Sequence, residues 1–214
     1  YGNYEEVGSS NWQDEIFQTA LSEDFNLSVS GGNEKGFYAY SGNYARQNGI
    51  IKNSGYSRYS LRANIGRHIN DWMEIGTNSS FTNSLTDFAN TLSYNTGIIR
   101  SAIIFPPVYG ADMDTNTMDN VNWLAANPAA YVNNAKDQLR AINFYNSSYL
   151  EIKLLPYLKF RQNLGIGYSN QERGSYYDRH TQEGFTPRNG IASRGIRRFI
   201  GVSVILLNCF SSTL

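Results

Sequence analysis

The chain is poor in charge and in cysteine, and both shortages exclude classes of protein. Only 17% of its 214 residues are charged, against about a quarter in an ordinary globular domain. Its 18 basic residues balance 18 acidic ones, and no basic patch is interleaved with aromatics, so we expect no binding to nucleic acid. The single cysteine, Cys209, excludes a disulfide within the chain.

Long apolar runs and the marks of a secretion signal are also absent. No stretch of about 18 or more apolar residues is present, so the sequence predicts no transmembrane helix. The opening YGNYEEVGSS has neither the basic nor the apolar region of a signal peptide. We therefore expect any export signal to lie upstream, and the chain to be part of a longer one.

Tyrosine and glycine, by contrast, are plentiful, with 16 and 19 residues. A charge-poor chain rich in these residues, asparagine and serine is typical of a sheet with one wet and one apolar face.

Alternation with a period of two predicts an all-β chain of about six antiparallel strands. In the clearest segment, Leu61 and Ile65 alternate with Arg62 and Asn64. Leu158, Leu164 and Ile152 are expected on the same apolar face, and Arg161 and Glu151 on the polar face. The expected strands are Phe25–Ser30, Phe37–Arg46, Tyr56–Ile69, Trp72–Phe81, Asn146–Leu154 and Tyr157–Ser169.

The connections between these strands alternate between short and long. Short turns are expected at Gly31–Gly36, at Asn70-Asp71 and near Pro156, and the longest connection runs from Asn83 to about Ile142. Short turns on one side and long loops on the other are typical of outer-membrane β-barrels. A soluble β-sandwich rarely accommodates so long a loop. Within this loop, Val121–Val132 is expected to form short helical turns broken at Pro128.

Several runs resemble the SusC/RagA family of TonB-linked outer-membrane proteins of the Bacteroidetes. They are NWQDEIF (Asn11–Phe17), the segment Asn26–Ile65 with SVSGG and GIIKNS, NDWMEIGTNSSFT (Asn70–Thr82), NPAAY (Asn127–Tyr131) and LKFRQNLGIGY (Leu158–Tyr168). The resemblance implies a transmembrane β-barrel of the 22-stranded class whose lumen holds a plug encoded upstream. It also implies transport rather than catalysis, with TonB, a SusD-like surface lipoprotein and an oligosaccharide or peptide ligand as partners.

The resemblance suggests a division of the chain into five parts, the last of them atypical. Arg198–Leu214 does not look like the family's next strand, because Val202–Leu207 is apolar apart from Ser203 where a polar, aromatic stretch is expected. The parts are 1–24, a segment entering the barrel; 25–85, strands one to four; 86–142, a long extracellular loop; 143–170, a hairpin; and 171–214, a loop and the atypical end.

Catalytic, metal and cofactor sites are poorly supported, and we expect none. His68 and His180 are best interpreted as solvated histidines. Asp112-x-Asp114-x-Asn116 begins like a calcium loop, but Thr117 and Trp123 stand where the loop needs glycine and glutamate.

The aromatic residues fall into two groups. Those on the predicted strands are expected to face lipid or to form a girdle at its boundary: Tyr38, Tyr40, Tyr44, Tyr59 and Tyr168. Those in the loops are candidates for stacking on a glycan or peptide, although packing between loops would also explain them: Trp123, Tyr109, Tyr176 and Tyr177.

The sequence therefore predicts part of a TonB-dependent transporter in the outer membrane, surrounded by lipid. Two alternatives stay open: a non-functional, truncated remnant of such a transporter, and a soluble, carbohydrate-binding β-sandwich.

Overall fold

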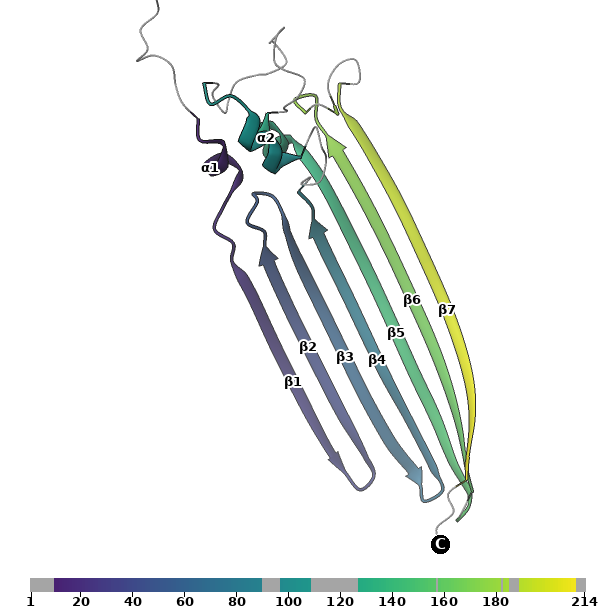
Figure 1. The fold of residues 1–214 in the computed structure, drawn as a ribbon. Helices are drawn as coiled ribbons and strands as arrows, with labels where there is room; N and C mark the ends of the chain where they lie inside the picture. Colours follow the sequence, from purple (N-terminus) through teal and green to yellow (C-terminus); the bar gives the residue numbers. More distant parts are fainter. Residues whose placement is uncertain are drawn as a thin grey trace, which may run out of the picture.

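The protein forms one antiparallel sheet in which every strand pairs with its neighbours along the chain (Figure 1). The computed structural model describes residues 10–89, 97–108, 127–156, 158–181, 183–184 and 189–210, with side chains omitted for 206–210. The seven strands are β1 (Ser22–Asn33), β2 (Gly36–Asn48), β3 (Gly55–Asn70), β4 (Met73–Asp87), β5 (Ala135–Leu155), β6 (Leu158–Tyr177) and β7 (Ile191–Phe210).

The register places apolar side chains on one face of the sheet and polar ones on the other. Leu61 is paired with Gly42 and Phe81, whereas its neighbour Arg62 is paired with Ser41 and Ser80. Because paired residues share a face and successive residues alternate, each row across the sheet belongs to one face. The row that defines the apolar face is Leu27, Gly42, Leu61, Phe81, Phe144, Tyr168 and Ile200; the row that defines the polar face is Ser28, Ser41, Arg62, Ser80, Tyr145, Gly167 and Gly201.

The register confirms that the residues predicted to share a face do so. Leu61, Ile65, Leu158, Leu164 and Ile152 belong to the apolar face, with the five strand tyrosines, and Arg62, Asn64, Arg161 and Glu151 belong to the polar face.

The observed strands are longer than the alternation predicted. β4 continues to Asp87 and β5 begins at Ala135, so residues at both ends of the segment expected as a loop, 86–142, are strand. Backbone pairing extends each strand beyond the point where its side chains stop alternating clearly: Thr86 and Asp87 still pair with Leu139 and Gln138.

The segment Arg198–Leu214, whose apolar sequence does not look like the family's next strand, is nevertheless part of a strand as far as Phe210. β7 pairs with β6 without interruption from Ile191 to Phe210. Alternation fails there because apolar side chains occupy both faces. Ile200, Val202 and Val204 extend the apolar face, while Phe199 and Ile205 belong to the polar face and are largely exposed.

All three tight turns lie at one end of the sheet (Figure 1). They join β1 to β2, β3 to β4 and β5 to β6. In the first, Asn33 Oδ1 accepts a hydrogen bond from the Lys35 backbone N–H at 2.9 Å; in the second, Asn70 Oδ1 accepts one from the Trp72 N–H at 3.2 Å. Asparagine side chains that cap the backbone two residues on favour such turns.

Three short helices lie at the opposite end (Figure 1). They are α1 (Trp12–Ile16), α2 (Ile98–Ile104) and α3 (Pro128–Asn134). α3 begins at the proline that was expected to break a helix. Proline has no N–H to lose at the first helical position, and Asn127 Oδ1 accepts hydrogen bonds from the Ala129 and Ala130 N–H groups at 3.0 and 3.4 Å.

The described part of the chain has one sheet and no second sheet packed against it. The β-sandwich alternative is therefore wrong. None of the helices in the described ranges has the length and apolar character needed to cross a membrane.

Candidate functional site

The three helices bury the main hydrophobic core of the described chain at the loop end of the sheet. Trp12 meets Phe105 edge to face, with ring centroids 5.1 Å apart, and its Nε1–H donates to the Pro106 carbonyl at 3.2 Å. We call this core the helix cluster. It consists of Trp12, Ile16, Ile51, Ile98, Ala102, Phe105, Ala129, Tyr131 and Val132.

Hydrogen bonds and apolar contacts fix the helix cluster to the strands. Asn53, in the β2–β3 connection, donates from Nδ2 to the Val132 carbonyl at 2.6 Å. Ala135 and Tyr177, which are paired on the polar face, pack against the cluster. The cluster therefore contacts the polar side of the sheet at its loop end.

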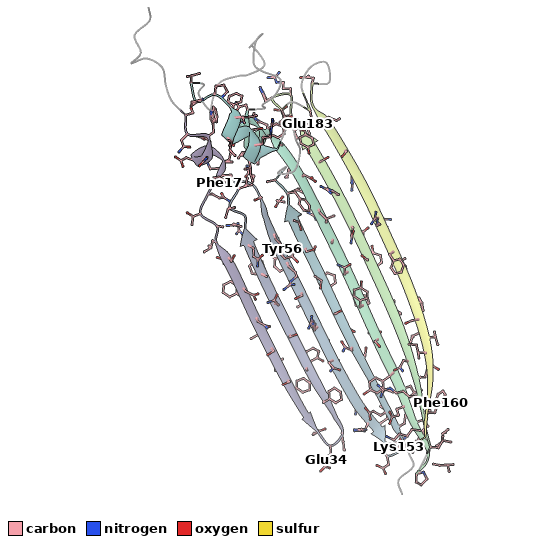
Figure 2. All side chains as sticks on the ribbon, viewed as in Figure 1. Phe17, Glu34, Tyr56, Lys153, Phe160 and Glu183 are labelled. Carbon is pink, nitrogen blue, oxygen red and sulfur yellow. The ribbon has the colours of Figure 1, made fainter. Side chains whose placement is uncertain are left out.

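A contact between side chains joins α3 to the connection between β6 and β7. The Tyr131 hydroxyl donates to the Glu183 carboxylate, and Figure 2 shows Glu183 near the helices at the loop end. Segments from five regions of the sequence, around residues 12, 51, 100, 130 and 183, thus meet there.

A hollow of about 870 Å³ lies beside the cluster. Its floor includes residues of the apolar face near the ends of the strands, such as Tyr44, Tyr59 and Tyr176, and its wall includes Asn133 and Asn134 of α3. Most of its side chains are polar, so it suits a polar ligand better than an apolar one.

Of the four loop aromatics predicted to stack on a ligand, the structure describes Tyr176 and Tyr177. Tyr176 and Tyr177 are successive strand residues and therefore lie on opposite faces: Tyr176 lines the hollow, and Tyr177 packs on the helix cluster. Tyr109 and Trp123 lie outside the described residues, as does the segment Asp112–Asn116.

Tyr177 lies at the very end of β6, beyond the length that a membrane-spanning strand requires. Burial, and secondly the Asp137 carboxylate, raise the pKa of its phenol above the ordinary value. Asp137 itself accepts hydrogen bonds from Arg173 at 3.0 and 2.7 Å, so this corner of the polar face is held by a bidentate ion pair.

At the turn end, the polar face carries a linked set of polar and charged side chains that the alternation in the sequence does not reveal as a group. The Tyr149 hydroxyl donates to Glu74 at 2.6 Å, and His68 lies 3.3 Å from the same carboxylate. The Arg161 guanidinium lies 4.2 Å above the Tyr149 ring. Glu151 is 3.5 Å from Arg161 and 3.2 Å from Lys159.

This polar network corrects the interpretation of His68, which is solvated but also paired with a carboxylate. His180 likewise lies 3.8 Å from Asp178. The alternation placed Glu151 and Arg161 on one face but could not reveal their partners, because partners depend on the register between strands. Within the described ranges, His, Cys, Asp and Glu form no group of three or more that could hold a metal ion.

The apolar face carries an aromatic row near the loop end. Phe25 stacks on Tyr44 with centroids 6.3 Å apart, and Tyr44 contacts Tyr59 at 4.8 Å. Tyr38 and Tyr40, 5.8 Å apart, lie nearer the turns of the same face. Aromatics toward both ends of an apolar band are the arrangement expected at the two interfaces of a membrane.

No family model matches the chain, but individual proteins do. It is 28% identical over 176 residues to TonB-dependent receptor P3 of Formosa agariphila, a match covering 78% of this chain and 18% of the relative. It is 34% identical over 89 residues to TonB-dependent receptor SusC of Bacteroides thetaiotaomicron, covering 40% of this chain and 9% of SusC.

The fold is also similar to that of a TonB-dependent receptor of known structure. The sheet is similar to part of a chain in the structure of the RagAB peptide transporter, with a TM-score of 0.70 and 20% sequence identity, over 94% of this chain and 23% of that one. In sequence and in fold the chain is similar to TonB-dependent receptors of the SusC/RagA type.

SusC/RagA-type receptors are non-enzymatic transport proteins of the outer membrane, and the seven-stranded sheet matches part of the RagA barrel. The chain spans about a fifth of the length of these relatives, 18% of receptor P3 and 23% of the RagAB chain.

Proposed function

We propose that the chain forms part of the wall of a TonB-dependent transporter that imports peptides or oligosaccharides across the outer membrane. In this proposal the apolar face meets lipid, the polar face lines the lumen, and a surface lipoprotein of the SusD type covers the loop end. TonB is proposed to act through the plug of the full-length receptor.

The separation of the two faces carries the proposal. One face of the sheet is apolar from β1 to β7, and an apolar face of this size needs a covering layer. No part of the described chain packs on it. Leu27, Leu61 and Val29 are each more than half exposed. Lipid is the solvent that makes such exposure favourable, and a closed barrel satisfies the backbone there.

The unequal connections support the sidedness. Tight turns face the periplasm in barrels of this kind and long connections face outward. By this rule the helix cluster, with α2 and α3 from the connection between β4 and β5, is proposed to lie at the extracellular mouth, where a ligand first meets the transporter.

The cargo class is proposed from the relatives and from the chemistry of the polar face. The RagAB structure is named as that of a peptide transporter, and a peptide or glycan needs donors and acceptors along its path. Of the four candidate aromatics, Tyr177 is best placed for a ligand in the lumen, because it belongs to the polar face. Tyr109 and Trp123 are proposed to contact cargo from the long loop. Tyr176, which belongs to the apolar face, is proposed to contact it at the rim, where the hollow is lined by residues of both faces such as Tyr59 and Asp137.

The lid contact is proposed at α2. Ile99 and Ile103 are four residues apart, so they share one face of the helix, and they are 40% and 68% exposed. Apolar side chains left exposed at a rim are typical of a protein interface.

Transport of labelled ligand by cells carrying the full-length receptor tests the function. We expect uptake of a labelled peptide or oligosaccharide that requires both the receptor and TonB. A folded receptor in the outer membrane that imports neither cargo class contradicts the proposal and favours the remnant alternative, which sequencing of the flanking reading frame then checks.

The lid is tested separately by Ile99→Asp/Ile103→Asp. This double variant should lose co-purification of the surface lipoprotein, whereas Ile50→Asp should retain it, because Ile50 is also 64% exposed but lies outside α2. Equal retention by both variants would place the lid elsewhere.

A further inference from the structure

Near its loop end the apolar face carries arginine on three different strands, and on β7 Ile196 lies on the same face beyond the arginine. Along β2 the residue after Tyr44 on this face is Arg46; along β5 the residue beyond Ile142 is Arg140; along β7 the residue beyond Ile200 is Arg198. All three arginines are exposed. The boundary of the apolar face is therefore marked by cations, next to the aromatic row.

The position of the boundary changes from strand to strand in a way that fits a tilted barrel. The row of paired residues that contains Phe25, Tyr44 and Tyr59 on β1 to β3 continues to Asn170 and Arg198 on β6 and β7. Barrel strands are inclined by about 35–45° to the membrane normal, so a row perpendicular to them changes depth. The same row leaves the apolar band on β6 and β7.

Four of the boundary cations gather on β5 and β7. Lys136 and Arg140 come from β5 and Arg194 and Arg198 from β7, all on the apolar face. We call these four residues the basic patch. Neighbouring strands lie about 4.8 Å apart and residues rise about 3.4 Å, so Arg140 and Arg198 are about 12 Å apart in the sheet. The sheet surface between these two arginines is therefore wide enough for about one or two lipid head groups.

Most of the positive charge of the basic patch is not neutralised by neighbouring carboxylates. Glu172, on β6 between the two strands, is 2.8 Å from Arg194, and Arg198 donates from Nε to Asn170 Oδ1 at 3.2 Å. Among the residues that the structure describes, the Arg194–Glu172 pair is the patch's one ion pair. On the polar face at the same end, by contrast, Arg173 is held by both oxygens of Asp137.

We propose that the basic patch binds the phosphate groups of outer-leaflet lipids. This inference relies on the proposed contact of the apolar face with lipid. Cations placed directly beyond an apolar band meet the head groups of the lipids whose chains cover that band. Arginine suits this ligand because its planar guanidinium binds phosphate through two parallel hydrogen bonds.

The test measures lipid binding to the full-length receptor in detergent by native mass spectrometry. The probes are lipid A with its phosphates, lipid A from which they have been removed, and inorganic phosphate. Arg140→Gln/Arg198→Gln removes two patch charges. Arg62→Gln/Arg197→Gln is the matched control, since it removes two charges from the polar face and Arg197 is the immediate neighbour of Arg198.

A cation near an anionic membrane surface strengthens association about fivefold, so the patch variant should bind phosphorylated lipid A about 25-fold more weakly than the unchanged receptor. The control should bind it as the unchanged receptor does. The unchanged receptor should prefer the phosphorylated lipid to the dephosphorylated one. Heat-modifiable migration in gels verifies that each variant is folded.

Equal binding of the two lipids, or equal losses in the patch and control variants, would overturn the inference. Displacement of the lipid by inorganic phosphate at the same concentration would show a free-anion site instead and would also overturn it. A change of oligomeric state in the patch variant without a change in lipid binding would indicate a protein contact. A receptor that is folded and imports cargo but fails these tests leaves the proposed transport function intact.

Discussion

Glycine residues face aromatic rings at four places where strands pair. A Cβ at any of these glycines would meet the ring of its partner on the next strand. Because glycine has no side chain, the aromatic ring of the paired residue can lie across the neighbouring strand. This contact stabilises the pairing of the two strands. The pairs are Gly31 with Tyr38, Gly66 with Phe37, Gly76 with Tyr149 and Gly167 with Tyr145.

Gly76→Val should destabilise the receptor by about 1–3 kcal/mol, the usual cost of forcing a side chain into filled space. The added carbons would overlap the Tyr149 ring and move its hydroxyl away from Glu74. Asn78→Val, two residues along β4 on the same face, is the control. Denaturant unfolding of the refolded receptor in lipid vesicles measures the unfolding free energy of both variants. If Asn78→Val lowers it as much as Gly76→Val does, the contact between Gly76 and the Tyr149 ring is not the cause.

Leu61→Arg tests which face meets lipid. A charge on the lipid side near mid-membrane costs about 2–4 kcal/mol of unfolding free energy, and much less on the lumen side. Asn64→Arg on the same strand should therefore have little effect, because Asn64 belongs to the polar face. Unfolding in lipid vesicles gives the free energies of unfolding of the two variants. If Asn64→Arg lowers that free energy more than Leu61→Arg does, the lipid and lumen faces are assigned the wrong way round.

At the level of elements, the helix cluster and the sheet are expected to respond separately to mutation. Trp12 is 3% exposed and has both a ring contact and a hydrogen bond in the cluster. Replacing such a residue with alanine costs about 3–5 kcal/mol. Because the cluster lies at the loop end of the sheet and touches only the ends of the strands, that cost should open the cluster and leave the sheet intact.

Trp12→Ala should therefore accelerate proteolysis in the loop-end connections by about a hundredfold or more, while heat-modifiable migration of the barrel stays unchanged. Ile103→Ala, in α2 but 68% exposed, is the control and should leave cleavage rates nearly unchanged. Loss of the folded barrel in Trp12→Ala would show that the cluster supports the strands.

The sequence predicted those elements whose side chains alternate. Six strands, their order and their faces follow from a period of two, because one residue of slip would expose the wrong face. β7 was missed for the same reason: with Phe199 and Ile205 on the face opposite Ile200 and Val202, its sequence has no period to detect.

The helices and the candidate site were harder to predict. α1 and α2 have five and seven residues, too few to show a helical period, and they are held by contacts with distant segments. The polar network around Glu74 and Glu151 depends on the register across hairpins. Residue type alone points to the loop aromatics, and it does not reveal that Tyr176 and Tyr177 lie on opposite faces of the sheet.

At the scale of the whole molecule, the sheet has two unpaired edges, β1 and β7. Single-chain bacterial barrels close with eight strands or more, and an open edge in hydrocarbon leaves backbone groups without partners at several kcal/mol each. The 214-residue chain produced alone should therefore aggregate in water and fail to give a heat-modifiable band in detergent. Size-exclusion chromatography and gel migration test this, and a soluble monomer with a sharp cooperative melt would contradict it.

The helix cluster also has a consequence for the order of folding. Each strand of the sheet pairs with the strand next to it in sequence, so the sheet can grow hairpin by hairpin with short loop closures. The hydrogen bond from Trp12 to Pro106 spans 94 residues, and Tyr131 reaches Glu183 across 52. Contacts of such separation close large loops and form late. The segment around Trp12 is made before the strands of this sheet, yet it should reach its final position only after the hairpins from β1 to β6 have formed.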